Sequence, residues 1–161
     1  MTASISYDSL PELNPSTRPR KAMKSVAICA SKRNAKESEA FAERLRSLRI
    51  LTFEPNFFES IPESFQFSSQ HVRNMVFKGV TLEHFEWIRR ADICYVLNID
   101  SYCGTSVTLE MGYAFALGKT IVAHSQSTGD PCRDCLIDFV APTTDELYQF
   151  LAGHPPKQFL R

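Results

Sequence analysis

Three short apolar segments, separated from one another by stretches with helical character, constrain the fold of this chain more than any other feature. They are SVAICA (25–30), DICYVLNI (92–99) and TIVAHS (120–125). A short and nearly continuous apolar run is typical of a strand that is covered on both faces. Strands that alternate with helices form a parallel sheet with helices on both sides. The sequence therefore predicts an α/β protein.

Periodicity and turn residues supply the other elements. Strands are predicted at 25–30, 50–53, 92–99, 120–125 and 138–141. Helices are predicted over about 31–49, 69–90, 106–117 and 143–153. Gly79 is a candidate interruption of the second helix, Gly118 is expected to end the third, and Thr143 or Thr144 is expected to cap the last.

The domain organisation follows from where these elements begin. Residues 1–23 are rich in Ser, Thr and Pro without apolar periodicity, and we expect a flexible N-terminal extension there. Residues 24–161 are expected to form one Rossmann-like (flavodoxin-like) domain with a sheet of about five parallel strands. The segment 54–68 carries two prolines and four phenylalanines without a clear period. It either borders a ligand site or plugs the core.

Composition excludes several classes of partner. Lys plus Arg and Asp plus Glu both number 18, so the chain has no basic footprint for a nucleic acid polymer. No apolar run approaches the roughly 20 residues that cross a bilayer, and no secretory signal precedes the first strand. Five scattered cysteines suit reduced thiols better than a disulfide framework. We expect a cytoplasmic protein that binds a small molecule or another protein.

Glu110 is the lone carboxylate in the apolar stretch SYCGTSVTLEMGYAFALGK (101–119). On a helix it shares one face with Val107, Tyr113, Ala114 and Leu117. Burying an ionised carboxylate without a partner is costly, so such a group is either satisfied by distant polar atoms or belongs to a functional site. Its place early on a helix, after a central strand, favours the functional interpretation because ligands bind at that end of a parallel sheet.

The segment ADICYVLNIDSYCGTSVTLEMGYAFALGK (91–119) resembles the signature of the nucleoside 2-deoxyribosyltransferase-like superfamily. The usual signature is an Ala-Asp pair, a hydrophobic strand, a Tyr-x-Gly turn, Glu-(Ile/Leu/Met)-Gly-Tyr-Ala and a Gly-Lys. The close match runs from Leu82 to Val122, and the coarse fold matches over most of the chain. The superfamily includes N-deoxyribosyltransferases and 2′-deoxynucleoside 5′-phosphate N-hydrolases.

The resemblance implies an activity and a nucleophile. It implies cleavage or transfer at the N-glycosidic bond of a nucleoside or nucleoside 5′-monophosphate, with no cofactor and no metal ion. It makes Glu110 the nucleophile that attacks the anomeric carbon, giving a covalent glycosyl intermediate as in retaining glycosidases. It also implies a homo-oligomer, a dimer or larger, because family members complete their sites with a neighbouring subunit.

His84 stands where the family has a second acid, an Asp before the Ala-Asp strand. A histidine can move a proton near neutral pH, so it is a candidate proton shuttle for the leaving base. It is also predicted to face the packed side of its helix with Val80, Trp87 and Ile88, where a histidine is often structural. The role of His84 therefore stays open between catalysis and packing.

The loops after the first and third strands hold the other candidates. Ser31, Lys32 and Arg33 occupy the loop that approaches the sugar and phosphate in the superfamily, but this loop lacks a Gly-rich phosphate cradle and is equally a solvated helix start. Asn98 or Asp100 are polar candidates beyond the third strand. Tyr102 either stacks on a base or covers the end of the sheet.

The start of the Glu110 helix supplies a final group of candidates. Ser106 or Thr105 is expected to be the N-cap, and in the nucleotide hydrolases the same helix start helps to hold phosphate. Gly104 and Gly112 are expected to permit close approach of the backbone to a ligand and of the helix to the sheet. Tyr113 is expected either to orient Glu110 or to lie at a subunit contact.

Three functions remain to be separated. The leading hypothesis is an enzyme that acts on the N-glycosidic bond. The alternative is a nucleotide-binding sensor or regulatory module that kept the pocket without turnover. A plain flavodoxin-like interaction domain is a weaker third hypothesis.

The CxxC motif in PCRDC (131–135) favours neither a metal site nor redox chemistry, because a second Cys or His pair is missing at zinc-site spacing.

Overall fold

The computed structural model describes residues 24–57, 65 and 68–153. The predicted N-terminal extension (1–23) lies outside the described residues, as does most of the aromatic segment 54–68. None of the described helices has both the length and the apolar character needed to cross a membrane.

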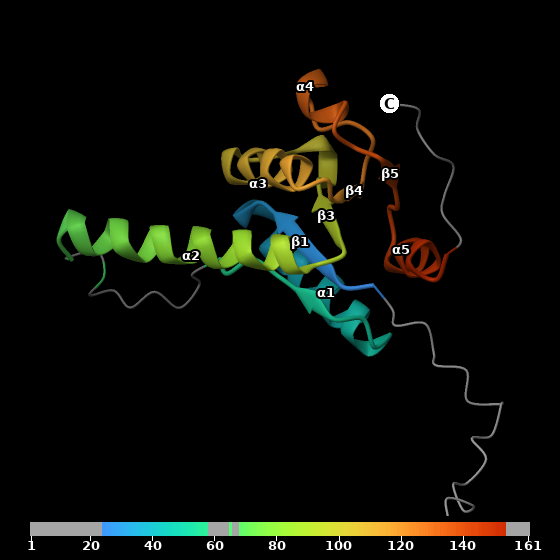
Figure 1. The fold of residues 1–161 in the computed structure, drawn as a ribbon, viewed down its shortest axis with the longest axis horizontal. Helices are drawn as coiled ribbons and strands as arrows, with labels where there is room; N and C mark the ends of the chain where they lie inside the picture. Colours follow the sequence, from blue (N-terminus) through green and yellow to red (C-terminus); the bar gives the residue numbers. More distant parts are fainter. Residues whose placement is uncertain (1–23, 58–64, 66–67, 154–161) are drawn as a thin grey trace, which may run out of the picture.

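One parallel sheet forms the centre of the domain (Figure 1). Its strands are β1 (Val26–Ala30), β2 (Thr52–Phe53), β3 (Ile93–Leu97), β4 (Thr120–Ala123) and β5 (Phe139–Val140). All neighbouring pairs are parallel, in the order β2-β1-β3-β4-β5. This confirms the predicted α/β fold with five parallel strands.

The central pair of strands marks the point where the chain reverses its direction of winding. Val26 pairs with Ile93 and Ala30 with Leu97, so β1 and β3 end at the same edge of the sheet. The chain moves outward from β1 to β2 and then returns across β1 to β3. The loops after β1 and β3 therefore diverge, and such a switch point is where open α/β sheets bind ligands.

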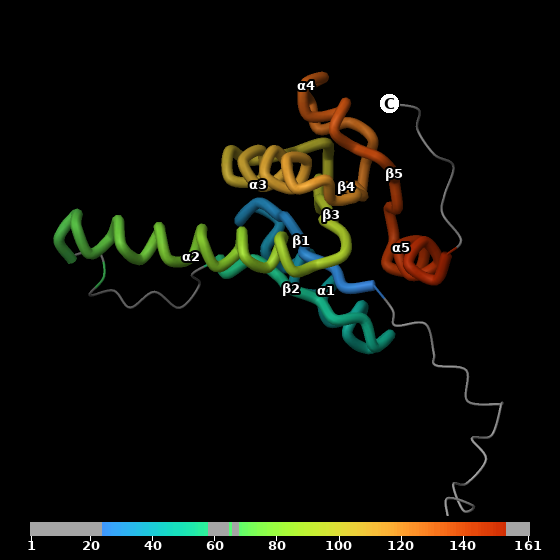
Figure 2. The backbone as a smooth tube through the Cα atoms, viewed as in Figure 1, coloured from blue at the N-terminus to red at the C-terminus, as the bar shows by residue number. Residues whose placement is uncertain are grey.

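Helices cover both faces of the sheet, as Figures 1 and 2 show. They are α1 (Ala35–Ser47), α2 (Gln70–Arg90), α3 (Thr105–Ala116), α4 (Pro131–Asp134) and α5 (Thr144–Leu151), with short 3-10 helices η1 (Lys32–Asn34) and η3 (Ile99–Ser101). Helices α1 and α5 contact each other on one face, and α2 and α3 contact each other on the other. The first part of α2 extends past the sheet, to the left in Figure 1.

Side-chain alternation along the strands divides the core into two clusters. Ile28 and Tyr95 belong to the cluster under α1 and α5. Cys29 and Cys94 belong to the cluster under α2 and α3. Because successive strand residues point to opposite faces, one strand supplies both clusters in turn.

The structure confirms the predicted cap of the last helix and the predicted end of the third. Thr143 caps α5 in a capping box with Glu146, in which each side chain satisfies a backbone N–H of the first turn. Gly118 follows α3 with a φ of +65°, the left-handed conformation that ends helices at low cost when the residue is glycine.

Two other local predictions were wrong. Helix α2 continues through Gly79, and a Cβ atom at this position would meet no other atom. Glycine lowers the stability of a helix by about 1 kcal/mol relative to alanine, and this cost does not interrupt α2. The N-cap of α3 is Gly104, with no side-chain cap, because Thr105 already belongs to the first helical turn. The short helix α4 was not predicted, since four residues are too few for a periodic pattern.

Candidate functional site

A pocket of about 430 Å³ lies at the carboxyl ends of the strands, between α2 and α3. Its lining residues come from the segments after β1, β2 and β3 and from the facing sides of the two helices. Seven of the predicted site residues line it: Ser31, Lys32, His84, Tyr102, Gly104, Ser106 and Glu110. The volume lies within the range of about 300–1,000 Å³ that is usual for small-molecule sites.

Helix α3 carries Glu110 into this pocket. Val107, Met111 and Ala114 are buried on the same helix and anchor this face against the sheet. The Glu110 residue is 8% exposed, so the carboxylate points with the apolar stripe as predicted. Leu117, which was expected on this face, is 39% exposed instead, because α3 ends at Ala116 and Leu117 is its C-cap.

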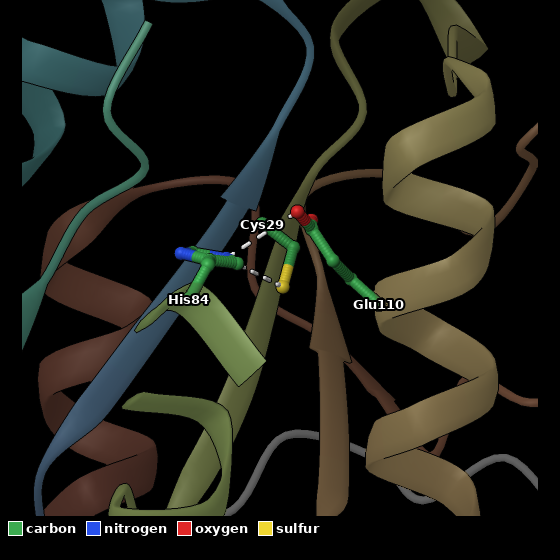
Figure 3. Close-up of side chains that lie close together, drawn as sticks. All are labelled: Cys29, His84 and Glu110. Atoms are coloured by element: carbon green, nitrogen blue, oxygen red, sulfur yellow. Dashed lines mark hydrogen bonds and ion pairs between the residues drawn. The ribbon is translucent and has the colours of Figure 1, made fainter. Parts of the chain in front are cut away.

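Helix α2 places His84 against the carboxylate of Glu110 (Figure 3). Nε2 of His84 lies 3.5 Å from Oε1 of Glu110. The imidazole is buried and meets the ring of Trp87 edge-on, with 5.8 Å between the ring centroids. The predicted packing of His84 and its proximity to the candidate nucleophile thus occur together, so the two open interpretations of this residue do not exclude each other.

Strand β1 contributes Cys29, which sequence reasoning did not include in the site. Its Sγ atom lies 3.7 Å from Nε2 of His84 and 3.4 Å from Sγ of Cys94. Cys29 is fully buried. Its position one residue before the end of β1 placed it near the ligand-binding edge, but a strand that is apolar on both faces gives no indication of the face to which its thiol points.

Burial dominates the electrostatics of these three groups. It raises the pKa of Glu110 to about 8, although a hydrogen bond with Cys29 acts against this rise. It lowers the pKa of His84 to about 4, and it raises the pKa of the Cys29 thiol well above its usual range. The short contact between His84 and Glu110 is therefore between neutral partners near pH 7, because each is charged only at a cost in desolvation.

Two atoms of this cluster are buried without a hydrogen-bond partner among the residues that the structure describes. They are Oε2 of Glu110 and Nδ1 of His84. Leaving a buried polar atom unsatisfied costs about 1–3 kcal/mol, and most such atoms in folded proteins are paired. Their presence at the inner end of a pocket is the pattern expected of a site that binds something polar.

The residues after β1 and β3 meet at the mouth of the pocket. A Cβ atom placed on Gly104 would lie 2.5 Å from Oγ of Ser31, so a larger residue at this position would require the Ser31 hydroxyl to turn away. Tyr102 is 39% exposed. The guanidinium carbon of Arg33 lies over its ring, 4.9 Å from the centroid of the Tyr102 ring, in a cation–π contact. Arg33 therefore contacts the pocket wall from outside, whereas Lys32 lines the pocket itself.

Other predicted site residues lie away from this pocket. The Asn98 amide bonds the backbone of Ser125 and Ser127, and thus ties the end of β3 to the loop after β4. Asp100 is exposed in η3 with a φ of +52°. Neither residue lines the pocket, so their assignment to ligand binding stays a prediction.

Gly112 and Tyr113 are the two remaining candidates on α3. Gly112 has open space around its Cα, so the predicted close approach of the helix to the sheet at this position was wrong. Tyr113 stacks on Phe85 of α2, with 4.5 Å between the centroids of nearly parallel rings. This contact joins the two helices that carry Glu110 and His84, and the expected role of Tyr113, to orient Glu110 or to lie at a subunit contact, stays a prediction.

Two sets of potential metal ligands can be compared. Cys132 and Cys135 of the CxxC motif are exposed and free. Cys29, His84 and Glu110 are buried together, and one potential ligand atom from each lies within 4.8 Å of the others. The family resemblance implied no metal ion, and no sequence motif joins these three residues, which are far apart in the chain.

These features define an α/β domain with a largely apolar pocket at its switch point, in which His84 and Glu110 are buried polar groups. The structure is similar to the 2-deoxyribosyltransferase of the psychrotolerant bacterium Bacillus psychrosaccharolyticus, with a TM-score of 0.59 and 23% sequence identity over 84% of this chain and 99% of that chain. A conserved protein from Enterococcus faecalis V583 matches with a TM-score of 0.44 and 16% identity over 80% of this chain and 88% of that chain. No family model and no curated protein matches the sequence.

The comparison confirms the resemblance at the level of the fold. The chain shares the fold of this deoxyribosyltransferase, and almost the full length of that protein is covered. At 23% identity this similarity concerns the fold. The roles of Glu110, His84 and the other site residues stay predictions.

Proposed function

We propose that this protein cleaves or transfers the N-glycosidic bond of a nucleoside or a nucleoside 5′-monophosphate. The observation that carries the proposal is the Glu110 carboxyl group, which is buried at the inner end of a pocket and keeps one oxygen without a partner among the described residues. The fold similarity to a deoxyribosyltransferase supports the same class of chemistry.

The reaction begins with Glu110. One carboxylate oxygen attacks the anomeric carbon of the sugar, an ester bond to the sugar forms, and the bond to the base nitrogen breaks. Water or a second base then releases the sugar from Glu110. A buried carboxylate is suited to this step because it is held in place and is weakly solvated.

His84 moves the proton in this proposal. The Glu110 carboxyl is neutral near pH 7 and gives up its proton as it attacks, and Nε2 of His84 lies 3.5 Å away to accept it. The other ring nitrogen, Nδ1, donates its proton to the departing base in the same step, so no charged imidazole accumulates. The proton balance closes without another acid, since the proton that leaves Glu110 is replaced on the base by the one from Nδ1.

The first test is base release from a panel of nucleosides and their 5′-monophosphates, followed by chromatography in the presence of a chelator. The wild-type protein should release free base from at least one member, and Glu110→Gln should abolish release. Glu83→Gln changes an exposed carboxylate on α2 and should leave the rate unchanged. Release by Glu110→Gln at the wild-type rate would overturn the mechanism.

The raised pKa of Glu110 favours a second candidate function. A carboxyl that is mostly protonated near pH 7, beside a histidine in place of an acid, suits a nucleotide-binding module without turnover. Equilibrium binding of a nucleotide with no base released by the wild-type protein would favour this module. If His84→Asp, which restores the family's acid, then gained base release, the histidine would be the reason for the loss.

The oligomer implied by the family resemblance is also part of the proposal. Val72, Met75 and Leu82 on α2 are 43%, 61% and 54% exposed, and part of this helix extends past the sheet. Apolar side chains grouped on an extended helix favour self-association. Light scattering should give a mass of at least two chains, and Met75→Asp should lower it.

A further inference from the structure

We propose that Cys29, His84 and Glu110 form a binding site for one divalent transition-metal ion of the zinc class. The ion would lie at the inner end of the pocket and compete with the nucleoside for Glu110. The metal site itself does not depend on the proposed function; the competition does.

The spacing of the three side chains fits a tetrahedral ion. Bonds from Zn²⁺ of about 2.3 Å to sulfur and about 2.0–2.2 Å to nitrogen and oxygen place neighbouring ligand atoms about 3.3–3.6 Å apart. The observed distances are 3.7 Å from Cys29 Sγ to His84 Nε2 and 3.5 Å from His84 Nε2 to Glu110 Oε1. All three ligand atoms lie within 4.8 Å of one another. An ion therefore fits once Cys29 and Glu110, whose ligand atoms lie within 4.8 Å of each other, approach by up to about 1.2 Å.

The chemistry of the donors selects the kind of ion. A thiol, an imidazole and a carboxyl together suit Zn²⁺, Co²⁺ and related ions, whereas Mg²⁺ and Ca²⁺ prefer a set made only of oxygen atoms. Three protein ligands leave the fourth position for water or a small ligand, as in catalytic rather than closed structural zinc sites. The pocket lined by His84 and Glu110 gives that position access to ligands.

The surroundings of the cluster support a rigid site. The three ligands come from β1, α2 and α3, which pack against one another, so little ordering is needed when the ion binds (Figure 3). Oε2 of Glu110 has no partner among the described residues, so the carboxylate has an oxygen to offer in either orientation. Cys94 also lies close to Cys29 but is outside the group of three.

Metal binding has a defined chemical balance. The ion displaces the protons of the Cys29 thiol and the Glu110 carboxyl to solvent and takes a lone pair from Nε2 of His84. No oxidant or reductant takes part. Once Glu110 is bound to the metal, its oxygen is not available to attack an anomeric carbon, so zinc should inhibit base release.

Titration with Co²⁺ tests the site directly, because a thiolate bound to cobalt gives a charge-transfer band. The full chain with Cys132→Ser and Cys135→Ser removes the exposed thiols that would bind the ion independently. After treatment with a chelator, it should bind one Co²⁺ per chain, with the visible bands of a four-coordinate ion. Zn²⁺ should displace the cobalt and remove these bands.

Variants in that background assign the ligands. Cys29→Ala should remove the charge-transfer band, and His84→Gln and Glu110→Gln should each weaken Co²⁺ binding by at least about 10- to 100-fold, the loss seen when even outer partners of metal ligands are removed. Cys94→Ala is the matched control, a buried thiol on the same face of the sheet, and should keep the band. Circular dichroism confirms that each variant is folded, and if Cys29→Ala fails to fold, Cys29→Ser replaces it.

Two results would overturn the metal site. One is no Co²⁺ band in the folded Cys132→Ser, Cys135→Ser protein, and the other is a band that persists in the folded variants of Cys29 and His84. If the protein releases base in chelator but binds no Co²⁺ in the titration, the proposed function stands and the metal site fails. If it binds one Co²⁺ but releases no base from any nucleoside, the metal site stands and the proposed function fails.

Discussion

The two faces of the sheet use the same strands for different purposes. Under α1 and α5, residues such as Ile28, Leu45 and Leu147 form a fully buried apolar cluster. The buried hydroxyl of Tyr95 donates a hydrogen bond of 2.8 Å to the carbonyl of Ala141, while Oγ of the buried Ser38 on α1 has no partner among the described residues. Under α2 and α3, the cluster instead borders His84 and Glu110, and each keeps a buried atom without a partner among the described residues.

The two faces therefore differ in the kind of buried group that lacks a partner, which is a hydroxyl on α1 but a carboxyl and an imidazole at the pocket between α2 and α3. Tyr95 and Glu110 are both polar and buried, but only the tyrosine has its polar group satisfied by the fold. Unsatisfied buried groups are destabilising, so a sequence selected for stability alone would replace Glu110 with an apolar residue. The first face holds the domain together, and the second carries the proposed chemistry.

The largest effect on stability is expected on the first face. Leu45→Ala removes a fully buried side chain and should lower the free energy of unfolding by about 2–5 kcal/mol. Leu51→Ala makes the same change at a side chain that is 62% exposed, and should cost less than about 0.5 kcal/mol. Chemical denaturation measures both. Equal losses would show that the α1 side is not the stabilising core.

A smaller effect, specific to the second face, is expected from pH. The pKa of Glu110 rises on folding from 4.5 to about 8, so the folded state binds the extra proton and stability falls as pH increases through this range. The pKa of His84 falls from 6.5 to about 4, which acts in the opposite direction between about pH 4.5 and 6.5. Above pH 6.5 the Glu110 contribution should dominate.

Denaturation in chelator between pH 6.5 and 8 tests this expectation. The wild-type free energy of unfolding should fall by at most about 2 kcal/mol relative to Glu110→Gln, which cannot ionise. Parallel pH profiles for the two proteins would mean that burial does not hold the Glu110 carboxyl in its neutral form.

The smallest effect concerns the satisfied polar group of the first face. Tyr95→Phe removes the hydrogen bond to the Ala141 carbonyl and should cost about 1 kcal/mol. Tyr148→Phe, at a half-buried position packed on the same cluster, is the matched control and should change stability by less than about 0.5 kcal/mol. If Tyr95→Phe were neutral, this buried hydrogen bond would not distinguish the two faces.

Much of this architecture was predictable from the sequence, because apolar runs and helical spacing report directly on burial. The five strands and the orientation of Glu110 on α3 follow from such patterns. The capping box at Thr143 and the left-handed Gly118 follow from residue types with strong local preferences.

Other features depend on contacts between distant segments. Cys29 faces His84 only because β1 and α2 pack together, and an all-apolar strand gives no sign of which face a cysteine takes. Gly104 lies against Ser31 of another loop and is the N-cap of α3, a contact that local preferences for Ser or Thr do not reveal. The three-residue cluster was missed for the same reason.

The most direct test of the central claim is mass spectrometry of the intact protein during reaction with a nucleoside that it cleaves. We predict a species heavier by one sugar residue after acid quench, with the added mass on the peptide that contains Glu110, and no such species for Glu110→Gln. Base release by the wild-type protein with the sugar attached to another residue, or with the adduct still present in Glu110→Gln, would contradict the assignment of Glu110 as the nucleophile.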